Sequence, residues 1–194
     1  MIDSNFRSPY QRFVIEPLLK NARFQKISPL HVTLAGLFSG LLIPLFLYFH
    51  QSLAALICLG VSGFCDTLDG SLARSRNATS SKGAVLDIVC DRVVEWAILL
   101  GLFLYHPHSR GVMTIVMLGA VLLCITTFLV VGIFQENTSE KSFHYSPGLI
   151  ERAEAFIFFS LMILVPHFFP FLALLFAGLT FLTSIIRIIQ FIKT

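Results

Sequence analysis

Long apolar runs separated by short polar segments are the dominant pattern along this chain. A helix that crosses the hydrocarbon core of a membrane needs about 20 consecutive and mostly apolar residues. Six segments meet this requirement, and polar or proline-containing sequences such as "HPHSRG" and "PHFFP" separate them. The pattern therefore predicts membrane-spanning helices at about residues 29–49, 52–75, 83–105, 111–134, 147–166 and 170–192.

The sequence before the first apolar run has a different pattern. Its apolar residues fall near helical spacing with basic residues between them, and the apolar set is Tyr10, Phe13, Val14, Leu18 and Leu19. A helix with one apolar and one basic face lies along a membrane surface. We therefore expect an N-terminal amphipathic interfacial helix at about residues 9–26, which Pro17 kinks or interrupts. A disordered basic tail is the alternative.

Composition agrees with a membrane protein and argues against a soluble one. Hydrophobic residues make up 56% of the 194 residues and charged residues only 13%, about half the charged fraction of a soluble domain. The net charge of +3 is modest, and we expect no nucleic-acid partner. The four cysteines form no CxxC pair, so they indicate neither a disulfide framework nor a zinc site. The predicted fold is one all-α membrane domain over residues 1–194, with a six-helix bundle at about 29–192.

Basic residues set the expected orientation, because loops rich in Lys and Arg stay on the cytoplasmic side. Arg110 is the one basic residue that clearly falls in a loop of the opposite side. Both termini and the loops at 75–82 and 135–147 are therefore predicted to be cytoplasmic. The basic residues on or near that side are Arg7, Arg12, Lys20, Arg23, Lys26, Arg74, Arg76, Lys82, Lys141, Arg152, Arg187 and Lys193.

Four aspartates stand in the otherwise apolar region "CDTLDGSLARSRNATSSKGAVLDIVCDR", residues 65–92. Asp66 and Asp69 are three residues apart and share one helix face, and Asp87 and Asp91 are four apart and share another. A short polar turn joins the two predicted helices, so the four carboxylates are expected to converge at the cytoplasmic membrane edge. Such a cluster requires protonation or divalent cations, because like charges repel and desolvation adds to the cost. Carboxylate oxygens suit Mg²⁺, Mn²⁺ or Ca²⁺.

The residues beside the aspartates favour a phosphorylated ligand. Gly70 and Ala73 extend the Asp66 and Asp69 face with small side chains, and Gly83 opens the next helix. Arg74 and Arg76 follow at the cytoplasmic end, where they can bind phosphate oxygens. Four carboxylates can hold two metals, and a two-metal site stabilises both the attacking and the leaving oxygen of an in-line phosphoryl displacement.

These positions together spell D-x2-D-G-x2-A-R-x8-G-x3-D-x3-D, from Asp66 to Asp91. The pattern resembles the signature of the CDP-alcohol phosphatidyltransferase family, and the six spans and amphipathic start resemble the same family over nearly the whole chain. The resemblance implies two divalent metals, Mg²⁺ or Mn²⁺, held by Asp66, Asp69, Asp87 and Asp91. It also implies that Asp91 is the catalytic general base. The implied CDP-binding residues are Pro29, Thr33, Asp66, Asp69, Gly70, Ala73, Arg74 and Gly83.

The first predicted helix begins with "SPLHVT", which resembles a second family feature, Pro-Asn-x-x-Thr. Pro29 and Thr33 match it, whereas Leu30 stands where asparagine is common. Ser28 and Pro29 also fit a helix N-cap followed by the first helical residue. The turn at the start of this helix therefore has two interpretations, helix capping and contact with the nucleotide.

Charged residues deeper in the predicted spans have two interpretations each. Arg152 resembles family positions that reach the acceptor, or it is an interfacial charge at a helix start. Arg187 binds a substrate phosphate, or it extends to the lipid headgroups. Glu95 is better explained as a structural acid than as part of a proton path from Asp91, and Arg92 is expected at the interface.

The resemblance implies an enzyme of phospholipid biosynthesis that transfers a phosphatidyl group from CDP-diacylglycerol to an acceptor hydroxyl and releases CMP. The acceptor is inositol phosphate, glycerol phosphate or another polar alcohol. A CDP-choline or CDP-ethanolamine phosphotransferase, a membrane prenyltransferase and a divalent-cation transporter are the alternatives. Membrane lipids are the expected surroundings, in the cell (inner) membrane. Gly36 and Gly40 form a small-xxx-small pair, which indicates close helix packing or a homodimer.

Overall fold

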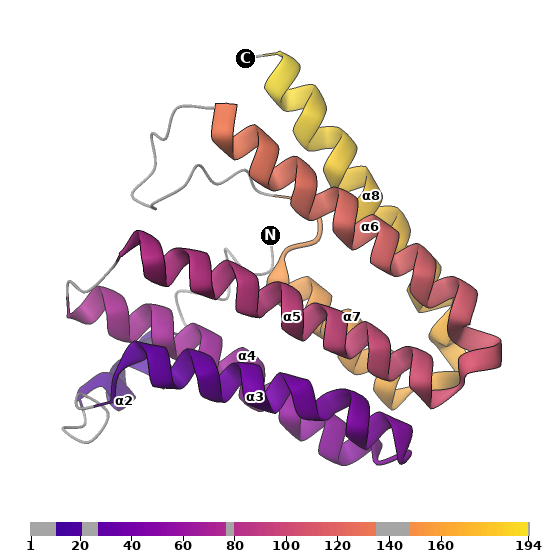
Figure 1. The fold of residues 1–194 in the computed structure, drawn as a ribbon, viewed down its shortest axis with the longest axis horizontal. Helices are drawn as coiled ribbons and strands as arrows, with labels where there is room; N and C mark the ends of the chain where they lie inside the picture. The colour runs from indigo at the N-terminus through magenta and orange to yellow at the C-terminus, as the bar shows by residue number, and fades with distance from the viewer. Residues whose placement is uncertain (1–10, 21–26, 77–79, 135–147, 194) are drawn as a thin grey trace. The chain divides into compact units, whose positions relative to one another are not determined.

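The computed structural model describes residues 11–20, 27–76, 80–134 and 148–193 (Figure 1). These residues are almost entirely helical and contain no strand, which confirms the predicted all-α class. A short π-helix comes first and a 3₁₀ turn precedes the last helix. In chain order the elements are η1 (Gln11–Ile15), α2 (Glu16–Lys20), α3 (Pro29–Tyr48), α4 (Ser52–Ser75), α5 (Ser81–Tyr105), α6 (Pro107–Phe134), α7 (Arg152–Leu164), η3 (Pro166–Phe168) and α8 (Phe169–Ile192).

Four helical segments are long and apolar enough to cross a membrane: α3, α4, α6 and the continuous stretch Pro166–Ile192. The protein is therefore an integral membrane protein. The other two predicted spans do not meet this standard in the described residues. Helix α5 has 25 residues but includes Lys82, Asp87, Asp91, Arg92 and Glu95, and α7 has only 13 residues and begins at Arg152 rather than near 147. A total of six spans stays a prediction.

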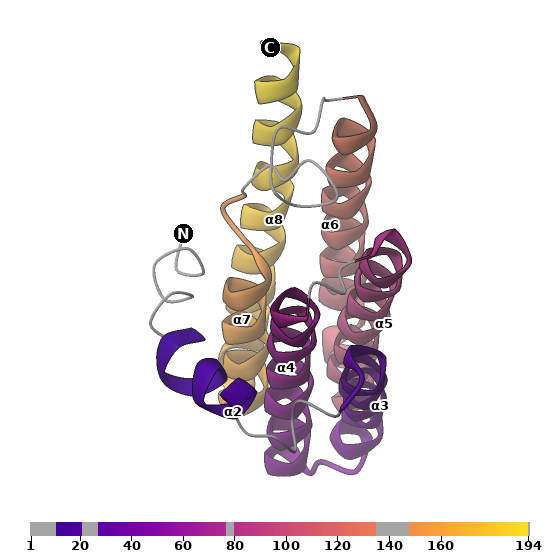
Figure 2. The same cartoon turned by 90° about the vertical axis from the view of Figure 1, so that its left-hand side faces the viewer.

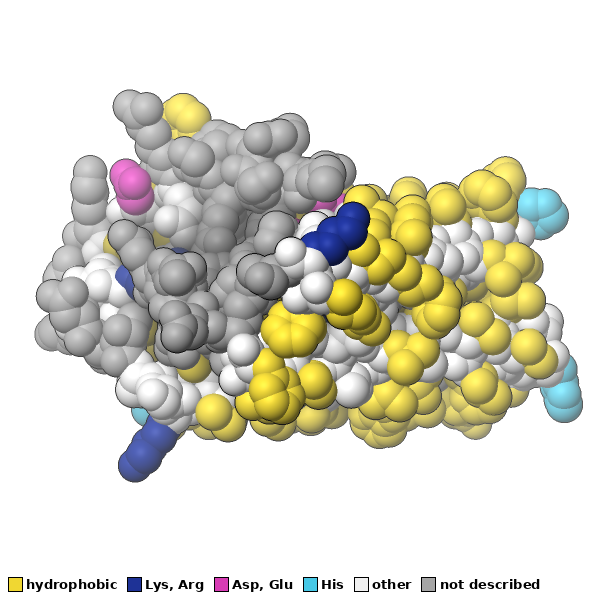
Figure 3. All heavy atoms as spheres, turned by 90° about the horizontal axis from the view of Figure 1, so that it is seen from above, with side chains coloured by type: hydrophobic (Ala, Val, Ile, Leu, Met, Phe, Trp, Pro, Cys, Tyr) yellow, Lys and Arg dark blue, Asp and Glu magenta, His cyan; other side chains and the backbone are white. Residues whose placement is uncertain are grey.

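The surface of the described helices agrees with burial in lipid. In Figure 3, apolar side chains cover much of the visible face where the residues are described, and charged side chains are few there. On α6, the side chains of Val112 and Ile115 are 71% and 70% exposed. Side chains of this kind face hydrocarbon in a membrane and would face water in a soluble protein.

The chain divides into two compact units, residues 1–105 and 106–194. In the first unit α3 packs along both α4 and α5 (Figure 1). Its interior is aliphatic, with fully buried side chains from all three helices: Ile43, Leu47, Leu59, Ile98 and Leu102. The turn between α3 and α4 uses a left-handed residue, His50 (φ 56°). The His50 ring packs edge-on against Tyr105 at the end of α5, with 4.7 Å between centroids.

Gly36 and Gly40 are used for packing within the chain. A Cβ at Gly36 would lie 2.9 Å from the Cβ of Cys65 on α4, and one at Gly40 would lie 2.6 Å from a methyl group of Val94 on α5. Both distances are shorter than side chains tolerate, so α3 approaches its two neighbours closely because these residues are glycines. Of the two interpretations of this pair, the geometry supports close helix packing, and the homodimer stays a prediction.

The N-terminal segment, which is the described stretch of η1 and α2, lies beside α4 in the first unit (Figure 2). Ile15 is 1% exposed and packs against Val32, Leu68 and Leu72. Phe13 is 75% exposed on the other side of the segment, and Pro17 lies just after the change from π-helix to α-helix. Residues 9, 10 and 21–26 of the predicted amphipathic helix lie outside the described residues, and its place at the membrane surface stays a prediction.

In the second unit α8 packs against α6 and α7. Phe159 of α7 and Phe176 of α8 are both buried, with ring centroids 5.2 Å apart. Arg110, expected in a loop, lies in the first turn of α6, where it is buried and its guanidinium carbon lies 4.2 Å from the centroid of the Phe169 ring. This cation–π contact gives the buried charge an aromatic partner.

Candidate metal and nucleotide site

Three of the four predicted aspartates come together in the structure. One carboxylate oxygen each from Asp66, Asp69 and Asp87 lies within 4.8 Å of the other two. Asp66 and Asp69 come from the second half of α4, and Asp87 comes from the second turn of α5. Asp69 is buried at 5% exposure, and the other two are half-buried. The i, i+3 spacing puts Asp66 and Asp69 on one face of α4, and the packing of both α4 and α5 against α3 brings Asp87 to them.

Asp91 is not part of that group among the described residues. It is half-buried and lies one helical turn after Asp87 on α5. The geometry therefore separates the four acids into a group of three and a single carboxylate further along the helix. A general base that is distinct from the metal ligands needs such a separation.

The group of three fits a hard divalent cation. Three carboxylates with oxygens this close, one of them nearly buried, repel one another unless a cation or protons neutralise them. All-oxygen ligands are the kind that Mg²⁺ and Mn²⁺ bind, with water and substrate phosphates completing the coordination. Asp66, Asp69 and Asp87 are the residues that would hold the metal.

Thr33 makes a direct connection to this group. Its Oγ1 donates a hydrogen bond to Oδ2 of Asp69 at 2.5 Å, and it also lies 3.1 Å from the carbonyl oxygen of Pro29. Ser28 occupies the N-cap position and Pro29 the first helical residue, although the Ser28 side chain makes no capping bond. The turn at the start of α3 thus places Thr33 beside the acids, whereas Leu30 is exposed. Sequence reasoning assigned Thr33 to the nucleotide and missed its contact with Asp69.

The small residues predicted to admit a ligand have a different neighbour in the structure. A Cβ at Gly70 would lie 3.2 Å from Nη1 of Arg74, so the Arg74 guanidinium occupies the space beside Gly70. Nη2 of Arg74 donates to Oγ of Ser71 at 3.2 Å, and Nε2 of Gln11 donates to the same oxygen at 3.2 Å. Ala73 is half-buried one turn after Gly70. No sequence signal pointed to Gln11 or Ser71.

Gly83 lies at the exposed start of α5. Its backbone N–H donates to Oγ of Ser80 at 3.1 Å, and the Ala84 N–H donates to the Ser80 carbonyl at 3.0 Å. These two bonds are those of an N-cap serine. Gly83 is therefore held at a helix N-terminus, where the exposed N–H groups and the helix dipole favour anions.

Glu95 is explained by an ion pair. Its Oε2 lies 2.6 Å from Nη1 of Arg92, one turn earlier on α5, and Glu95 is buried. The structure supports the interpretation of Glu95 as a structural acid.

The two arginines proposed for the acceptor lie in the second unit. Arg152 is the first residue of α7, behind a capping box formed by Glu151 and Glu154, and its guanidinium lies 5.5 Å from the Phe156 ring. Arg187 on α8 is 6% exposed, so it does not extend to the protein surface as a snorkelling side chain does. Its Nη1 donates to the carbonyl oxygen of Cys124 on α6 at 2.9 Å.

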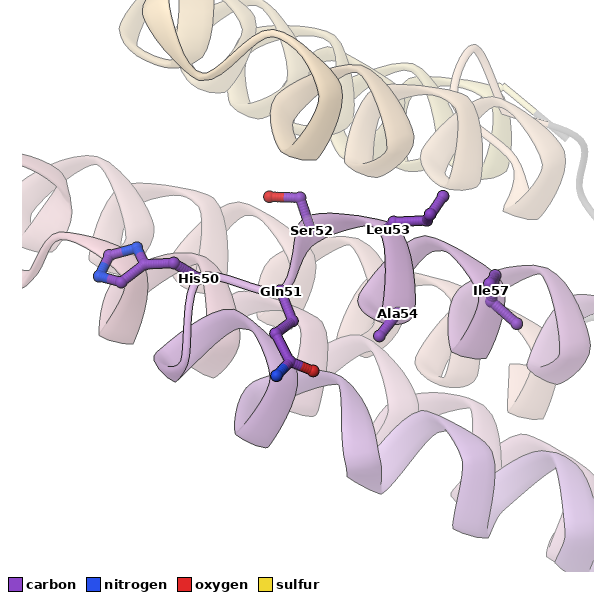
Figure 4. A pocket seen from close by; sticks show the side chains of 6 residues that line it. All are labelled: His50, Gln51, Ser52, Leu53, Ala54 and Ile57. Atoms are coloured by element: carbon purple, nitrogen blue, oxygen red, sulfur yellow. The ribbon is translucent and has the colours of Figure 1, made fainter.

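A shallow surface hollow lies at the other end of the first unit, around the turn between α3 and α4 (Figure 4). His50, Gln51, Ser52, Leu53, Ala54 and Ile57 line it. This hollow is at the start of α4, whereas Asp66 and Asp69 are near its end. It contains no carboxylate and is separate from the aspartate group.

The comparisons with known proteins agree with the geometry. Residues 26–190 match the family model described as CDP-alcohol phosphatidyltransferase. A relative in Escherichia coli, the inner membrane protein YnjF, is 31% identical over 169 residues, which cover 84% of this chain and 82% of that protein. The phosphatidylinositol phosphate synthase of Corynebacterium glutamicum is 28% identical over 81% of this chain and 71% of that protein.

A third relative matches over a shorter region. The phosphatidylinositol phosphate synthase of Mycobacteroides abscessus is 36% identical over 92 residues, which cover 47% of this chain and only 41% of that protein. Among solved structures, the phosphatidylinositol phosphate synthase of Mycobacterium tuberculosis with CDP-DAG bound shares the fold, with a TM-score of 0.65 and 22% identity over 93% of this chain and 90% of that one. The match along residues 26–190, which includes every position of the aspartate motif, shows that this chain belongs to the CDP-alcohol phosphatidyltransferase family.

Proposed function

We propose that the protein transfers the phosphatidyl group of CDP-diacylglycerol to the hydroxyl group of a polar alcohol, releases CMP and thereby makes a phospholipid. The observation that carries this proposal is the convergence of Asp66, Asp69 and Asp87 inside a chain of this family. Relatives named phosphatidylinositol phosphate synthase and a structural neighbour with CDP-DAG bound support the choice of donor. Family membership argues against the prenyltransferase and the cation transporter.

The proposed roles follow the geometry of the first unit. Asp66, Asp69 and Asp87 hold Mg²⁺ or Mn²⁺, which when bound neutralises negative charge on the diphosphate. Arg74 and the N-terminus of α5 at Gly83 bind the diphosphate oxygens, and Pro29, Gly70 and Ala73 border the cytidine. The resemblance also implies that Asp91 is a metal ligand, and Mn²⁺ binding by Asp91→Asn tests that prediction.

The reaction itself needs one proton transfer and one displacement. Asp91 takes the proton of the acceptor hydroxyl, and the acceptor oxygen forms a bond to the β-phosphorus of the donor. The bond from that phosphorus to the bridging oxygen breaks, and CMP leaves with the electron pair. A positioned carboxylate base contributes about 10²–10⁴ in rate.

The proposed setting is one domain in the cell membrane. The matched region spans both compact units, which supports treating residues 1–194 as one domain of about six spans with an interfacial N-terminal helix. Arg74 lies at the end of α4, Arg76 follows it and Lys82 lies at the start of α5, and this excess of basic residues near the aspartates supports a cytoplasmic position for this edge and for both termini. A homodimer stays a prediction.

The test is an activity panel on purified protein. CDP-diacylglycerol is offered with Mn²⁺ or Mg²⁺ and with inositol phosphate, glycerol phosphate, inositol or serine, and CMP release and lipid product are measured. The expected result is metal-dependent CMP release with one of these acceptors and none in the Asp87→Asn variant. Turnover of CDP-choline or CDP-ethanolamine with diacylglycerol, and none of CDP-diacylglycerol, would overturn the proposal.

A further inference from the structure

Thr33 stands out because it comes from a different helix and contacts the most buried of the three acids. Asp69 is 5% exposed, and a buried carboxylate is stable only with hydrogen-bond donors or a cation. The Thr33 hydroxyl supplies one such donor to Oδ2 from 36 residues away in the sequence. A hydroxyl-to-carboxylate bond is among the stronger kinds of hydrogen bond, because the acceptor is charged.

The Thr33 side chain is itself held in place. Its hydroxyl lies between Oδ2 of Asp69 and the carbonyl oxygen of Pro29, one turn earlier on α3, and its single proton serves one acceptor at a time. The ionised carboxylate is the stronger acceptor. The second branch at Cβ limits the rotation of the side chain within the helix. Thr33 therefore presents its donor from a fixed direction.

A close approach of two helices makes this contact possible. One turn after Thr33, Gly36 lies so near Cys65 that a Cβ at position 36 would come within 2.9 Å of the Cys65 Cβ. Val32, next to Thr33, is buried with Leu68, next to Asp69. Because α3 and α4 approach this closely, a side chain as short as threonine reaches the carboxylate directly.

From these contacts we propose that Thr33 is a positioning residue that fixes the carboxylate plane of Asp69 for metal binding. This proposal rests on the proposed function of the Asp66, Asp69 and Asp87 group as the metal site. It differs from the role that the motif implies for Thr33, which is contact with the nucleotide. Partners of this kind behind a metal ligand typically change metal affinity by about 10–100-fold when they are lost.

The test measures Mn²⁺ binding without substrate, by electron paramagnetic resonance on the purified full chain. Thr33→Val keeps the branched shape and removes the hydroxyl, and its Mn²⁺ dissociation constant should rise by about 10–100-fold. Thr33→Ser keeps the hydroxyl and should bind Mn²⁺ close to the wild-type value. Ser39→Ala is the matched control, because Ser39 donates from α3 to the Cys58 carbonyl on α4 at 2.9 Å, about three turns before Asp69.

Three outcomes separate the possibilities. Weak Mn²⁺ binding in Thr33→Val with normal binding in Thr33→Ser and Ser39→Ala supports the proposal, provided that the thermal stability of the three variants in EDTA is similar. Normal Mn²⁺ binding in Thr33→Val together with weakened CDP binding overturns it in favour of direct nucleotide contact. If Asp69→Asn binds Mn²⁺ as the wild type does, the metal site of the proposed function is wrong, and the role of Thr33 fails with it.

Discussion

The guanidinium of Arg74 lies over Gly70, so close that a Cβ at position 70 would be 3.2 Å from Nη1 of the arginine. The two residues are one helical turn apart on α4. The Ser71 hydroxyl oxygen accepts a hydrogen bond from Nη2 of Arg74 and another from Nε2 of Gln11 in the N-terminal segment. The missing side chain at Gly70 therefore leaves room for the Arg74 guanidinium of the same motif. The spacing of the motif did not indicate this contact.

This relationship predicts the effect of Gly70→Ala. The added methyl group displaces the Arg74 guanidinium, and the KM for CDP-diacylglycerol should rise by about tenfold if that guanidinium binds the diphosphate. Gly60→Ala is the matched control on the same helix, because no described atom beyond the adjoining residues and helix backbone lies within 4 Å of the new Cβ. Equal donor KM values for the two variants would contradict the proposed role of Arg74.

The aspartate group predicts a second set of effects. Asp66→Asn, Asp69→Asn and Asp87→Asn each remove one charge from the three oxygens that lie within 4.8 Å of one another. Each should abolish turnover and weaken Mn²⁺ binding, because a neutral amide is a poor substitute for a carboxylate ligand. The measurements are CMP release and Mn²⁺ titration. Full activity of Asp87→Asn without added divalent metal would show that the reaction does not use a metal at this site.

Asp91 should behave differently from the other three. It lies outside the group of close oxygens, so Asp91→Asn should leave binding of Mn²⁺ and of the CDP donor nearly unchanged. Turnover should fall by about 10²–10⁴, the usual contribution of a general base. A variant within tenfold of wild type would argue against a base, and loss of Mn²⁺ binding as complete as in Asp66→Asn would make Asp91 a ligand.

Much of the site was predictable because helical spacing alone decides which acids share a face. The shared face of Asp66 and Asp69 followed from their separation of three residues. Of the six spans that the apolar runs predicted, four are long and apolar enough to cross a membrane in the described residues. The sequence does not reveal which donors reach a buried carboxylate from another helix. The contact of Thr33 with Asp69 depends on how closely α3 and α4 approach, and that distance is set by packing at Gly36.

The start of α7 shows a second limit of sequence patterns. Apolar residues before Arg152 extended the predicted span to about 147, but the helix begins at Arg152. Residues 149 and 150 instead donate their backbone N–H groups to Oγ1 of Thr183 on α8, at 3.1 and 3.3 Å. A tertiary hydrogen bond of this kind competes with helix formation, and hydropathy does not register it.

Helix packing in the first unit predicts an effect on stability. A Cβ at Gly101 of α5 would lie 3.0 Å from the Cα of Pro44 and 2.8 Å from a methyl group of Leu47, both on α3. Because backbone has to move, Gly101→Ala should destabilise the protein by about 1–3 kcal/mol. Gly60→Ala, which meets no described atom, should be neutral or slightly stabilising. Thermal unfolding in detergent compares the two, and equal melting temperatures would contradict the close packing of α3 on α5.

The second unit predicts different outcomes for its two arginines. Arg187 is buried, donates to the Cys124 carbonyl of α6, and lies 5.2 Å from the Phe128 ring. Its removal leaves a cavity and breaks a bond between α6 and α8, so Arg187→Ala should lower the melting temperature. Arg152 is half-buried at the start of α7 and contacts Phe156, so Arg152→Ala should leave stability nearly unchanged.

Kinetics then separate a structural arginine from one that binds the acceptor. A charge-assisted bond to a phosphate is worth about 1.5–3 kcal/mol, so for a phosphorylated acceptor Arg152→Ala should raise the acceptor KM by about 10–100-fold and leave the donor KM unchanged. An unchanged acceptor KM in this variant would make Arg152 an interfacial charge. Arg187→Ala should lower the melting temperature and leave both the donor KM and the acceptor KM nearly unchanged. A rise in the acceptor KM of Arg187→Ala at unchanged melting temperature would instead show that Arg187 binds the acceptor phosphate. A side chain that only joins α6 to α8 has no reason to change the acceptor KM and leave the donor KM unchanged.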